Sequence, residues 1–510
     1  MISRSEMESD TVSGPGKQTS FYKNGTFYNQ ELEFLGEMYH SASSLSRLEF
    51  TTRFTDNILV DPERFSIEKL AYNFKDEKND ITFGDYFANF TQYSFSKAIK
   101  GAGFQHNFQD DKNYIRATYG SFYNQWDYLL HNWVSKTLRQ TEPMSRYGGG
   151  ARYQIGGDKY FVGFNSVFIS DQENDGNRIS ENAYSQNLNS IDWEYVFKSL
   201  RFMGEHARSD TRTKPFSGDK TTKDAWANTI KMRGDAFGFS LDARIENVAP
   251  DFSTLGGGAT PDRRRYYGNI SRQLTKHLRG YLMSDYYYNR IDDTSTATTK
   301  TNNSIIETGL TQTNILSRKD MVLSGIYRFG KDKNVDGTNE RIKNRVKLSL
   351  SDRLFKELKY KAAVEGIFEE DVPDQTMGNN YLYSFDLSWR CKLTKDLIIR
   401  PEAFYSYRFT DNVTTRGDDK VNTVRFNLTG DYKGNNRFGM GAELIGSNVF
   451  QGTDSCNKSW NLYYERALKM VKDATFKIDY KVNMYDFSGD HPGDDNYTEK
   501  RFIMSFNMRI

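Results

Sequence analysis

Two polar runs in the sequence have the residue spacing of a calcium-binding loop. They are Asp171, Glu173 and Asp175 before Gly176, and Asp332, Asn334 and Asp336 before Gly337. Side-chain oxygens at every second position let a loop wrap around Ca²⁺, and the glycine allows the sharp turn. The glutamate expected at the twelfth position is replaced by Asn182 and Lys343. Hydrated polar turns are therefore the competing interpretation, and calcium is the only metal for which the sequence offers candidate ligands.

Residues suited to catalysis are scarce and scattered. The chain has two cysteines and six histidines, and it contains no HExxH, GxSxG or P-loop pattern. The absence of a CxxCH motif excludes covalent attachment of a c-type haem to this chain. We therefore predict that the protein is not an enzyme, that it has no catalytic residues and that it carries no covalently bound cofactor.

Composition narrows the class of protein further. The chain has 510 residues, and its 69 basic and 67 acidic residues give a net charge of only +2, so nucleic acid is not an expected partner. Aromatic residues make up 15% of the chain, which argues against disorder. We find no run of 18 apolar residues, and no apolar export signal in the first residues.

Long segments alternate apolar and polar residues with the period of a β-strand. Clear examples are residues 237–246, 424–433 and 473–485, in which every second residue is apolar or small. Short and long polar connections alternate between such segments. We predict 19 strands after residue 145 and five to seven before it.

These patterns predict one domain and a strand number. We expect a flexible polar lead over residues 1–28 and a barrel over residues 29–510. Strands are harder to delimit over 29–138, where segment 80–108 could be an inward element. If both termini lie on the side of the short turns, the number of strands is even. The prediction is 22 to 26 strands, with 26 the best value.

Three features favour a membrane barrel over a soluble or fibrous all-β protein. Segments of about 10 to 13 residues match tilted strands that cross a bilayer, whereas soluble strands average about 5–6 residues. Full charges occupy the middle of the polar faces, which a water-filled lumen tolerates. Short and long connections alternate, as they do in barrels with short turns on one side of the membrane. A propeller would instead place four short strands in each repeat.

The chain resembles a Gram-negative outer-membrane β-barrel over about residues 30–510. The resemblance rests on the repeated amphipathic hairpins and on the final segment 501–510, which is similar to the C-terminal strand that the barrel-assembly machinery reads. It departs from the family in ending at Ile510 rather than at a phenylalanine. The fold class predicted is thus all-β, a single antiparallel up-and-down transmembrane β-barrel in the outer membrane. Cys391 is expected at the periplasmic end of its strand and Cys456 in a long external loop, so the thickness of the membrane separates them and no disulfide is expected.

The polar faces of the strands identify candidate lumen residues, which are the sites where this class of protein meets its cargo. They are Asp242, Arg244, Lys359, Lys361, Arg425, Asp431, Lys477, Asp479 and Lys481. Because both signs of charge occur on these faces, strong ion selectivity is not expected.

The expected width of the barrel suggests two alternative hypotheses for its function. Barrels of 22 strands already carry a plug, and a wider open hole would leak. One hypothesis is a sheath around a periplasmic partner, since the chain is similar in width to the plugless sheath barrels of porin–cytochrome conduits that enclose a multihaem cytochrome. The other is a diffusion porin or substrate channel narrowed by its own loops, of which 170–187, 209–222, 248–261 and 289–301 are the largest.

One basic cluster lies at the expected outer rim. Arg263, Arg264 and Arg265 open the strand that follows the long loop 248–261. Arginine suits phosphate recognition, so contact with lipopolysaccharide is a possible role, and a solvated rim is the simpler alternative. Outer-membrane lipid and lipopolysaccharide are therefore expected partners in either function.

Overall fold

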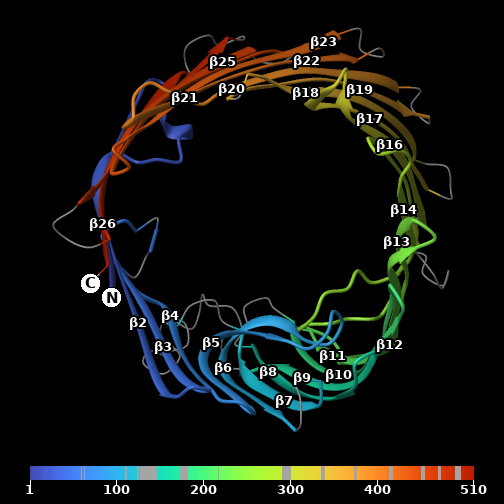
Figure 1. Ribbon diagram of the computed structural model, residues 1–510. Helices are drawn as coiled ribbons and strands as arrows, with labels where there is room; N and C mark the ends of the chain where they lie inside the picture. Colours follow the sequence, from blue (N-terminus) through green and yellow to red (C-terminus); the bar gives the residue numbers. More distant parts are fainter. Residues whose placement is uncertain are drawn as a thin grey trace.

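The computed structural model describes the chain except at residues 59, 62–63, 109–111, 123–125, 127–145, 173–181, 216, 290–299, 335–338, 356, 373–375, 413–416, 450–453, 469–472, 489–494 and 510. The described residues form one closed ring of long β-strands (Figure 1). A single 3-10 helix, η1 (Lys17–Thr19), accompanies them. In the described part of the chain, no helix has the length and apolar character needed to cross a membrane.

The first half of the ring contains thirteen strands. They are β1 (Ile2–Ser13), β2 (Gly25–Ser41), β3 (Ser44–Thr55), β4 (Phe65–Lys75), β5 (Asn79–Asn89), β6 (Ser96–Asn107), β7 (Tyr114–Ser121), β8 (Arg146–Gly156), β9 (Tyr160–Asp171), β10 (Ala183–Phe197), β11 (Leu200–Lys214), β12 (Thr221–Ala236) and β13 (Phe239–Val248).

The second half continues in the same manner. It contains β14 (Arg263–Gln273), β15 (Leu278–Asn289), β16 (Thr301–Ile315), β17 (Arg318–Asn334), β18 (Glu340–Phe355), β19 (Leu358–Asp371), β20 (Thr376–Trp389), β21 (Cys391–Lys392), β22 (Leu397–Asn412), β23 (Gly417–Tyr432), β24 (Asn436–Asn448), β25 (Asp454–Leu468), β26 (Ala474–Ser488) and β27 (Tyr497–Arg509).

The ring closes between the two ends of the chain. Strand β1 pairs antiparallel with β2 on one side and with β27 on the other, from Ile2 opposite Arg509 to Ser13 opposite Thr498. Strand β21 is a two-residue continuation of β20, because both pair with β22. The barrel therefore has 26 strands, as predicted, and the all-β up-and-down fold is confirmed.

The expectation of a flexible lead over residues 1–28 is wrong. Residues 2–13 form β1 and residues 25–28 belong to β2. Strand β1 alternates in the same way as the others, but its outward residues include Ser3, Ser5 and Ser9, so it lacks the apolar signal that marks the remaining strands. Its hydrogen bonds to β27 remove the two exposed edges that an open sheet would present.

The other early strands agree with the prediction in most places. Segment 80–108 is a hairpin of β5 and β6, and only its connection, residues 90–95, turns into the barrel. Residues 127–138, the end of the region in which strands were hard to delimit, lie outside the described residues. From β8 onward the structure contains the 19 expected strands when β20 and β21 are taken as one.

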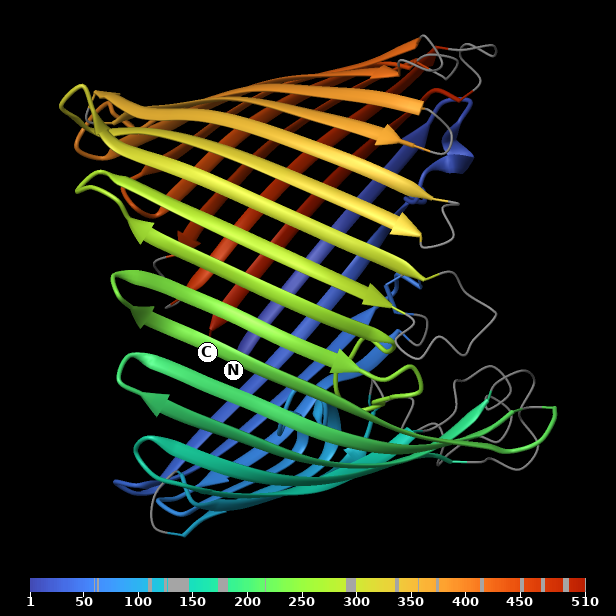
Figure 2. The same ribbon diagram turned by 90° about the vertical axis from the view of Figure 1, so that its right-hand side faces the viewer.

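Short and long connections emerge at opposite ends of the barrel (Figure 2). The short turn between β12 and β13 is Phe237-Gly238, whose φ angles of 54° and 76° fit a two-residue hairpin turn that follows the twist of the strands. Cys391 and Cys456 are both free, as expected.

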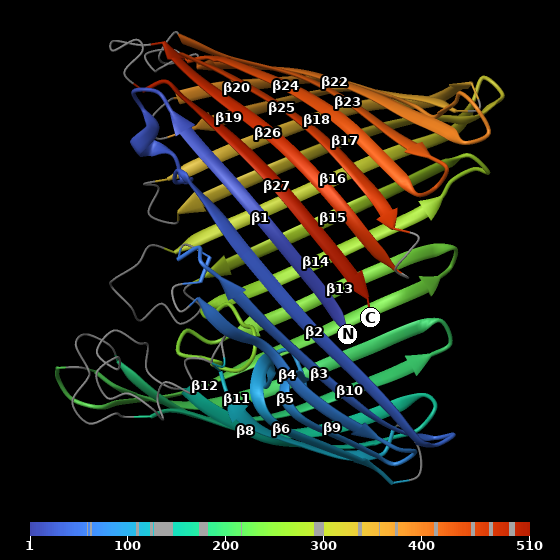
Figure 3. The same cartoon turned by 90° about the vertical axis from the view of Figure 1, so that its left-hand side faces the viewer.

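The outward face of the barrel is apolar. Large side chains such as Ile230, Ile245, Leu310, Leu348 and Val424 remain between 46 and 56% exposed on it. Long tilted strands follow one another around the ring (Figure 3), and exposed apolar side chains recur on most of them. A soluble protein does not leave so large an apolar surface in water, whereas lipid covers it without cost.

Candidate functional site in the barrel lumen

The register of β13 shows which side chains face the lumen. Asp242, Arg244 and Glu246 alternate with Leu241 and Ile245, and Ile245 is among the exposed apolar residues of the outer face. Inside the barrel, Arg244 donates to Gln92 at 3.5 Å and pairs with Glu246 at 2.9 Å. Asp242 pairs with Arg233 of the neighbouring strand at 2.9 Å.

The remaining predicted lumen residues have the same orientation. Lys359 and Lys361 share their face of β19 with Glu365, opposite the exposed Val364. Arg425 donates to Glu443 at 2.9 Å, and Asp431 pairs with Arg400 at 2.5 Å. On β26, Lys477 and Asp479 pair at 3.1 Å, and Lys481 lies opposite Arg501. Ion pairs of this kind, within one strand or between neighbouring strands, leave the lumen mixed in sign.

Two connections enter the lumen from the end with the long loops. Residues 90–95, between β5 and β6, meet residues 249–262, between β13 and β14, against the inner face of β9 to β13 (Figure 1). We call these two segments together the inner shelf. Ser96 N donates to Gly256 O at 2.7 Å, Gly258 N donates to Gln92 O at 2.8 Å, and Thr254 Oγ1 donates to Tyr93 O at 2.7 Å.

The inner shelf covers a small hydrophobic core inside the lumen. Tyr93, Phe95 and Phe252 are at most 1% exposed, and the rings of Tyr93 and Phe252 lie 5.8 Å apart, edge to face. Ile169 and Leu188 of the barrel wall are 0% exposed beneath them. Without the shelf, these apolar wall residues would be exposed to the water of the lumen, so the shelf accounts for their burial.

Two buried glutamates fix the shelf to the wall. Glu205 on β11 accepts from Thr91 Oγ1 at 2.5 Å and from Tyr93 N at 3.3 Å. Glu246 on β13 accepts from Tyr93 Oη at 3.1 Å and pairs with Arg244 and with Arg263. Burial, followed by the negative charge of Glu246, raises the pKa of Tyr93 well above its usual range, so the phenol stays protonated and continues to donate.

A third inward segment, residues 14–24, lies near the closing seam. Ser20 Oγ donates to Glu499 at 2.6 Å, and the guanidinium of Arg501 lies 5.2 Å from the ring of Tyr22. The sequence did not reveal this segment as structured, because its Ser, Gly and Lys residues have the composition of a solvated loop.

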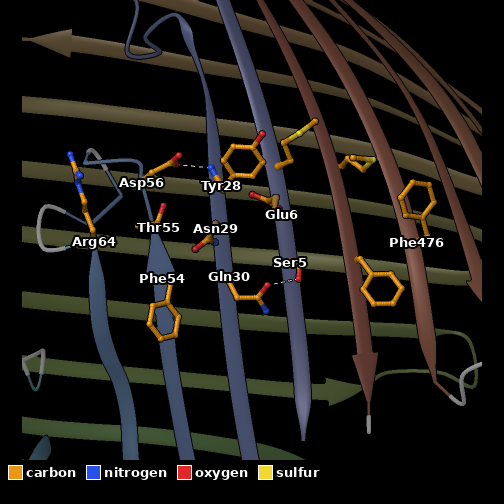
Figure 4. A pocket seen from close by; sticks show the side chains of 13 residues that line it. Ser5, Glu6, Tyr28, Asn29, Gln30, Phe54, Thr55, Asp56, Arg64 and Phe476 are labelled. Atoms are coloured by element: carbon orange, nitrogen blue, oxygen red, sulfur yellow. Dashed lines mark hydrogen bonds between the residues drawn. The ribbon is translucent and has the colours of Figure 1, made fainter.

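A shallow groove of about 470 Å³ lies on the outer face of the same seam. Figure 4 shows Tyr28, Phe54 and Phe476 in front of the sheet, with the opposite wall behind it. Between them Ser5 Oγ donates to Gln30 Oε1 at 2.5 Å. These polar groups face the lipid, and their mutual hydrogen bond lowers the cost of keeping them there.

The candidate calcium ligands are divided by the structure. Asp171 ends β9 and pairs with Arg146 at 2.6 Å, while Glu173, Asp175 and Asp336 lie outside the described residues. Asp332 and Asn334 belong to β17, where Asp332 accepts from Asn303. Among the described residues, no three acidic, histidine or cysteine side chains are grouped to hold a metal. Calcium binding at these loops stays a prediction.

The arginine run is also divided. Arg263 pairs with Glu246 at 3.4 Å and Arg265 with Asp285 at 2.6 Å, both on the lumen side. Arg264 points outward with Tyr288, whose ring lies 5.8 Å from its guanidinium. Only Arg264 therefore has the orientation that contact with a lipid headgroup requires, and the predicted cluster of three does not exist on the outer surface.

A closed ring of 26 long strands, apolar outside and charged inside, has the architecture of an outer-membrane type of transmembrane β-barrel. No family model matches the chain. No curated protein matches it either.

Several solved structures are similar in fold at low identity. The P pilus usher (PapC) translocation pore is 11% identical, with full coverage of both chains and a TM-score of 0.37. The siderophore receptor PirA from Pseudomonas aeruginosa is 11% identical, with 99% of this chain and 80% of that chain covered and a TM-score of 0.41. OprD from Pseudomonas aeruginosa is 11% identical, with 70% and 93% covered and a TM-score of 0.29.

Proposed function

We propose that the barrel is a sheath that encloses a periplasmic partner protein, such as a multihaem cytochrome, within the outer membrane. The observation that carries this proposal is the wide, water-accessible lumen. Lys359 and Lys361 are exposed on its wall, and the side chains of Arg425 and Lys477 are 48 and 39% exposed. The described inward segments lie against parts of the wall and do not cover these residues.

The width of the lumen is the physical reason to expect a partner protein inside it. A barrel of 16 to 18 strands already leaves an aqueous channel, and 22-stranded transporters carry a plug. An unfilled lumen of 26 strands would let periplasmic proteins and solutes escape. A protein threaded through the lumen would seal it, and its polar surface would replace water against the charged wall.

The alternative is a diffusion or substrate channel narrowed from within. The inner shelf favours it, because the shelf is a fixed element that reduces the cross-section on the side of β9 to β13. It would act together with the long loops at the same end of the barrel. This alternative requires no partner and predicts stable conductance from the isolated protein.

The deciding experiment is purification of the tagged protein from detergent-solubilised outer membranes. We expect a stoichiometric periplasmic protein to co-purify, and a multihaem partner would add a haem absorbance band that this chain cannot supply by itself. If the barrel purifies alone and reconstitutes as a pore of steady conductance in planar bilayers, the sheath proposal is wrong and the channel alternative holds.

A further inference from the structure

The lumen wall carries opposite net charge on two separated groups of strands, and we propose that these are the two docking faces for the enclosed partner. The partner would present a carboxylate-rich face to β18 and β19 and a basic face to β27, β1 and β2. This inference rests on the proposed sheath function and names the chemistry of its interface.

The first group, which we call the basic stripe, lies on β18 and β19. The register places seven cations on its lumen face: Arg341, Lys343, Arg345, Lys347, Arg353, Lys359 and Lys361. Only three carboxylates share that face, Glu365, Glu369 and Asp371.

Ion pairs within the basic stripe leave positive charge over. Glu365 pairs with both Arg345 and Lys347, at 2.8 and 3.2 Å. Glu369 pairs with both Arg341, at 2.7 Å, and Lys343. Since each of these two carboxylates is shared by two cations, four positive charges meet only two negative charges, and the net charge of the group is positive. Lys359 and Lys361 add two further charges that are exposed to the lumen, where Lys361 lies opposite Asp386 of β20.

The second group, which we call the acidic stripe, lies on β27, β1 and β2. Its lumen face has seven carboxylates: Glu499, Glu6, Glu8, Asp10, Glu31, Glu33 and Glu37. Three arginines accompany them, Arg4, Arg501 and Arg509.

In the acidic stripe, each of two arginines is shared by two carboxylates. Arg501 lies 2.5 Å from Glu8 and 3.7 Å from Asp10, and Arg4 contacts both Glu31 and Glu33. Each guanidinium therefore serves two carboxylates. The surplus here is negative.

The three special parts of the wall are spread around the ring. The basic stripe, the acidic stripe and the wall under the inner shelf lie at separate sectors in Figure 1. A partner that fills the lumen would thus meet a positive wall, a negative wall and a shelf, which fixes its rotation about the barrel axis. Like charges brought together by a wrong rotation repel, so opposite stripes specify orientation more than affinity.

The first test is zero-length carbodiimide cross-linking of the co-purified complex, which joins carboxylates to amines in direct contact. We expect partner carboxylates to be joined to Lys343, Lys347, Lys359 or Lys361, and partner lysines to Glu31 or Glu33. Cross-links of the reverse polarity, or none to either stripe, would overturn the inference while leaving the sheath intact. Absence of any stoichiometric partner overturns both.

The second test compares two variants with equal loss of charge. Lys359→Gln/Lys361→Gln removes two cations of the basic stripe. Lys331→Gln/Lys333→Gln removes two from β17 that face away from the lumen and pair with Glu340. We expect the first variant to raise the dissociation constant of the partner about 3- to 10-fold at fixed salt, and the second to leave it unchanged. Equal effects of the two variants would refute the docking faces.

Discussion

Tyr93 Oη donates a hydrogen bond to Glu246 at 3.1 Å across 153 residues of sequence, and both side chains are 0% exposed. The contact joins residues 90–95 of the inner shelf to strand β13, which leads directly into the other shelf segment, residues 249–262. It explains why a charged residue can be fully buried inside a water-filled barrel: Arg244, Arg263 and the phenol satisfy its oxygens. The shelf is therefore a packed element of the fold.

The hydroxyl of Tyr93 should contribute measurably to stability. Tyr93→Phe keeps the ring against Phe252 but leaves a buried carboxylate one donor short, so we expect the free energy of unfolding to fall by about 1–3 kcal/mol. Urea unfolding in phospholipid vesicles measures this. Tyr119→Phe, at an exposed outward position, is the matched control. An equal loss in both variants would contradict the anchoring role.

Close approach of the two shelf segments requires Gly257. A Cβ there would lie 2.5 Å from the carbonyl oxygen of Tyr93, whereas a Cβ on Gly258 would have no heavy atom within 4 Å. We expect Gly257→Ala to lower the free energy of unfolding by about 1–3 kcal/mol and Gly258→Ala to change it little. If both alanine variants unfold at the same urea concentration, the shelf is not packed as described.

Closure by β1 can be tested with a disulfide. Met7 and Met504 are direct cross-strand neighbours, and such pairs have Cα atoms about 4.5–5.5 Å apart, within reach of a disulfide. In a background lacking Cys391 and Cys456, we expect Met7→Cys/Met504→Cys to oxidise and to cross-link the two ends of the chain. Met7→Cys/Met440→Cys, with Met440 on β24, should remain reduced. A flexible N-terminal lead would give no preference between them.

The two faces of a strand should differ in their tolerance of charge. Val424, at the middle of β23, is 46% exposed on the outer face, and Thr423 beside it faces the lumen. Lysine at the bilayer midplane costs about 2–4 kcal/mol, so we expect Val424→Lys to lose that much stability and Thr423→Lys to lose little. Unfolding titrations in vesicles would report the difference, and the opposite ranking would invert the assignment of the faces.

Alternation with period 2 allowed most of the fold to be predicted from sequence. It gave the 19 strands after residue 145 and the orientation of residues such as Lys477 and Asp479, because a strand places successive side chains on opposite faces. The expectation that both termini lie on the side of the short turns then required an even number of strands. Strand β1 escaped this reasoning because serines occupy several of its outward positions, and only pairing with β2 and β27 makes it a strand.

The sequence did not predict which side chains pair on the lumen wall or which loops turn into the lumen. The run Arg263-Arg264-Arg265 is continuous in sequence, but the pleat of β14 sends its first and last members inward to Glu246 and Asp285. Long-range contacts such as that of Tyr93 with Glu246 depend on closure of the whole ring. The sequence by itself determined most of the strands and their faces, since these follow from local periodicity. Only the tertiary structure decided which charges meet across the wall and which loops turn inward, because both depend on neighbours that are distant in the chain.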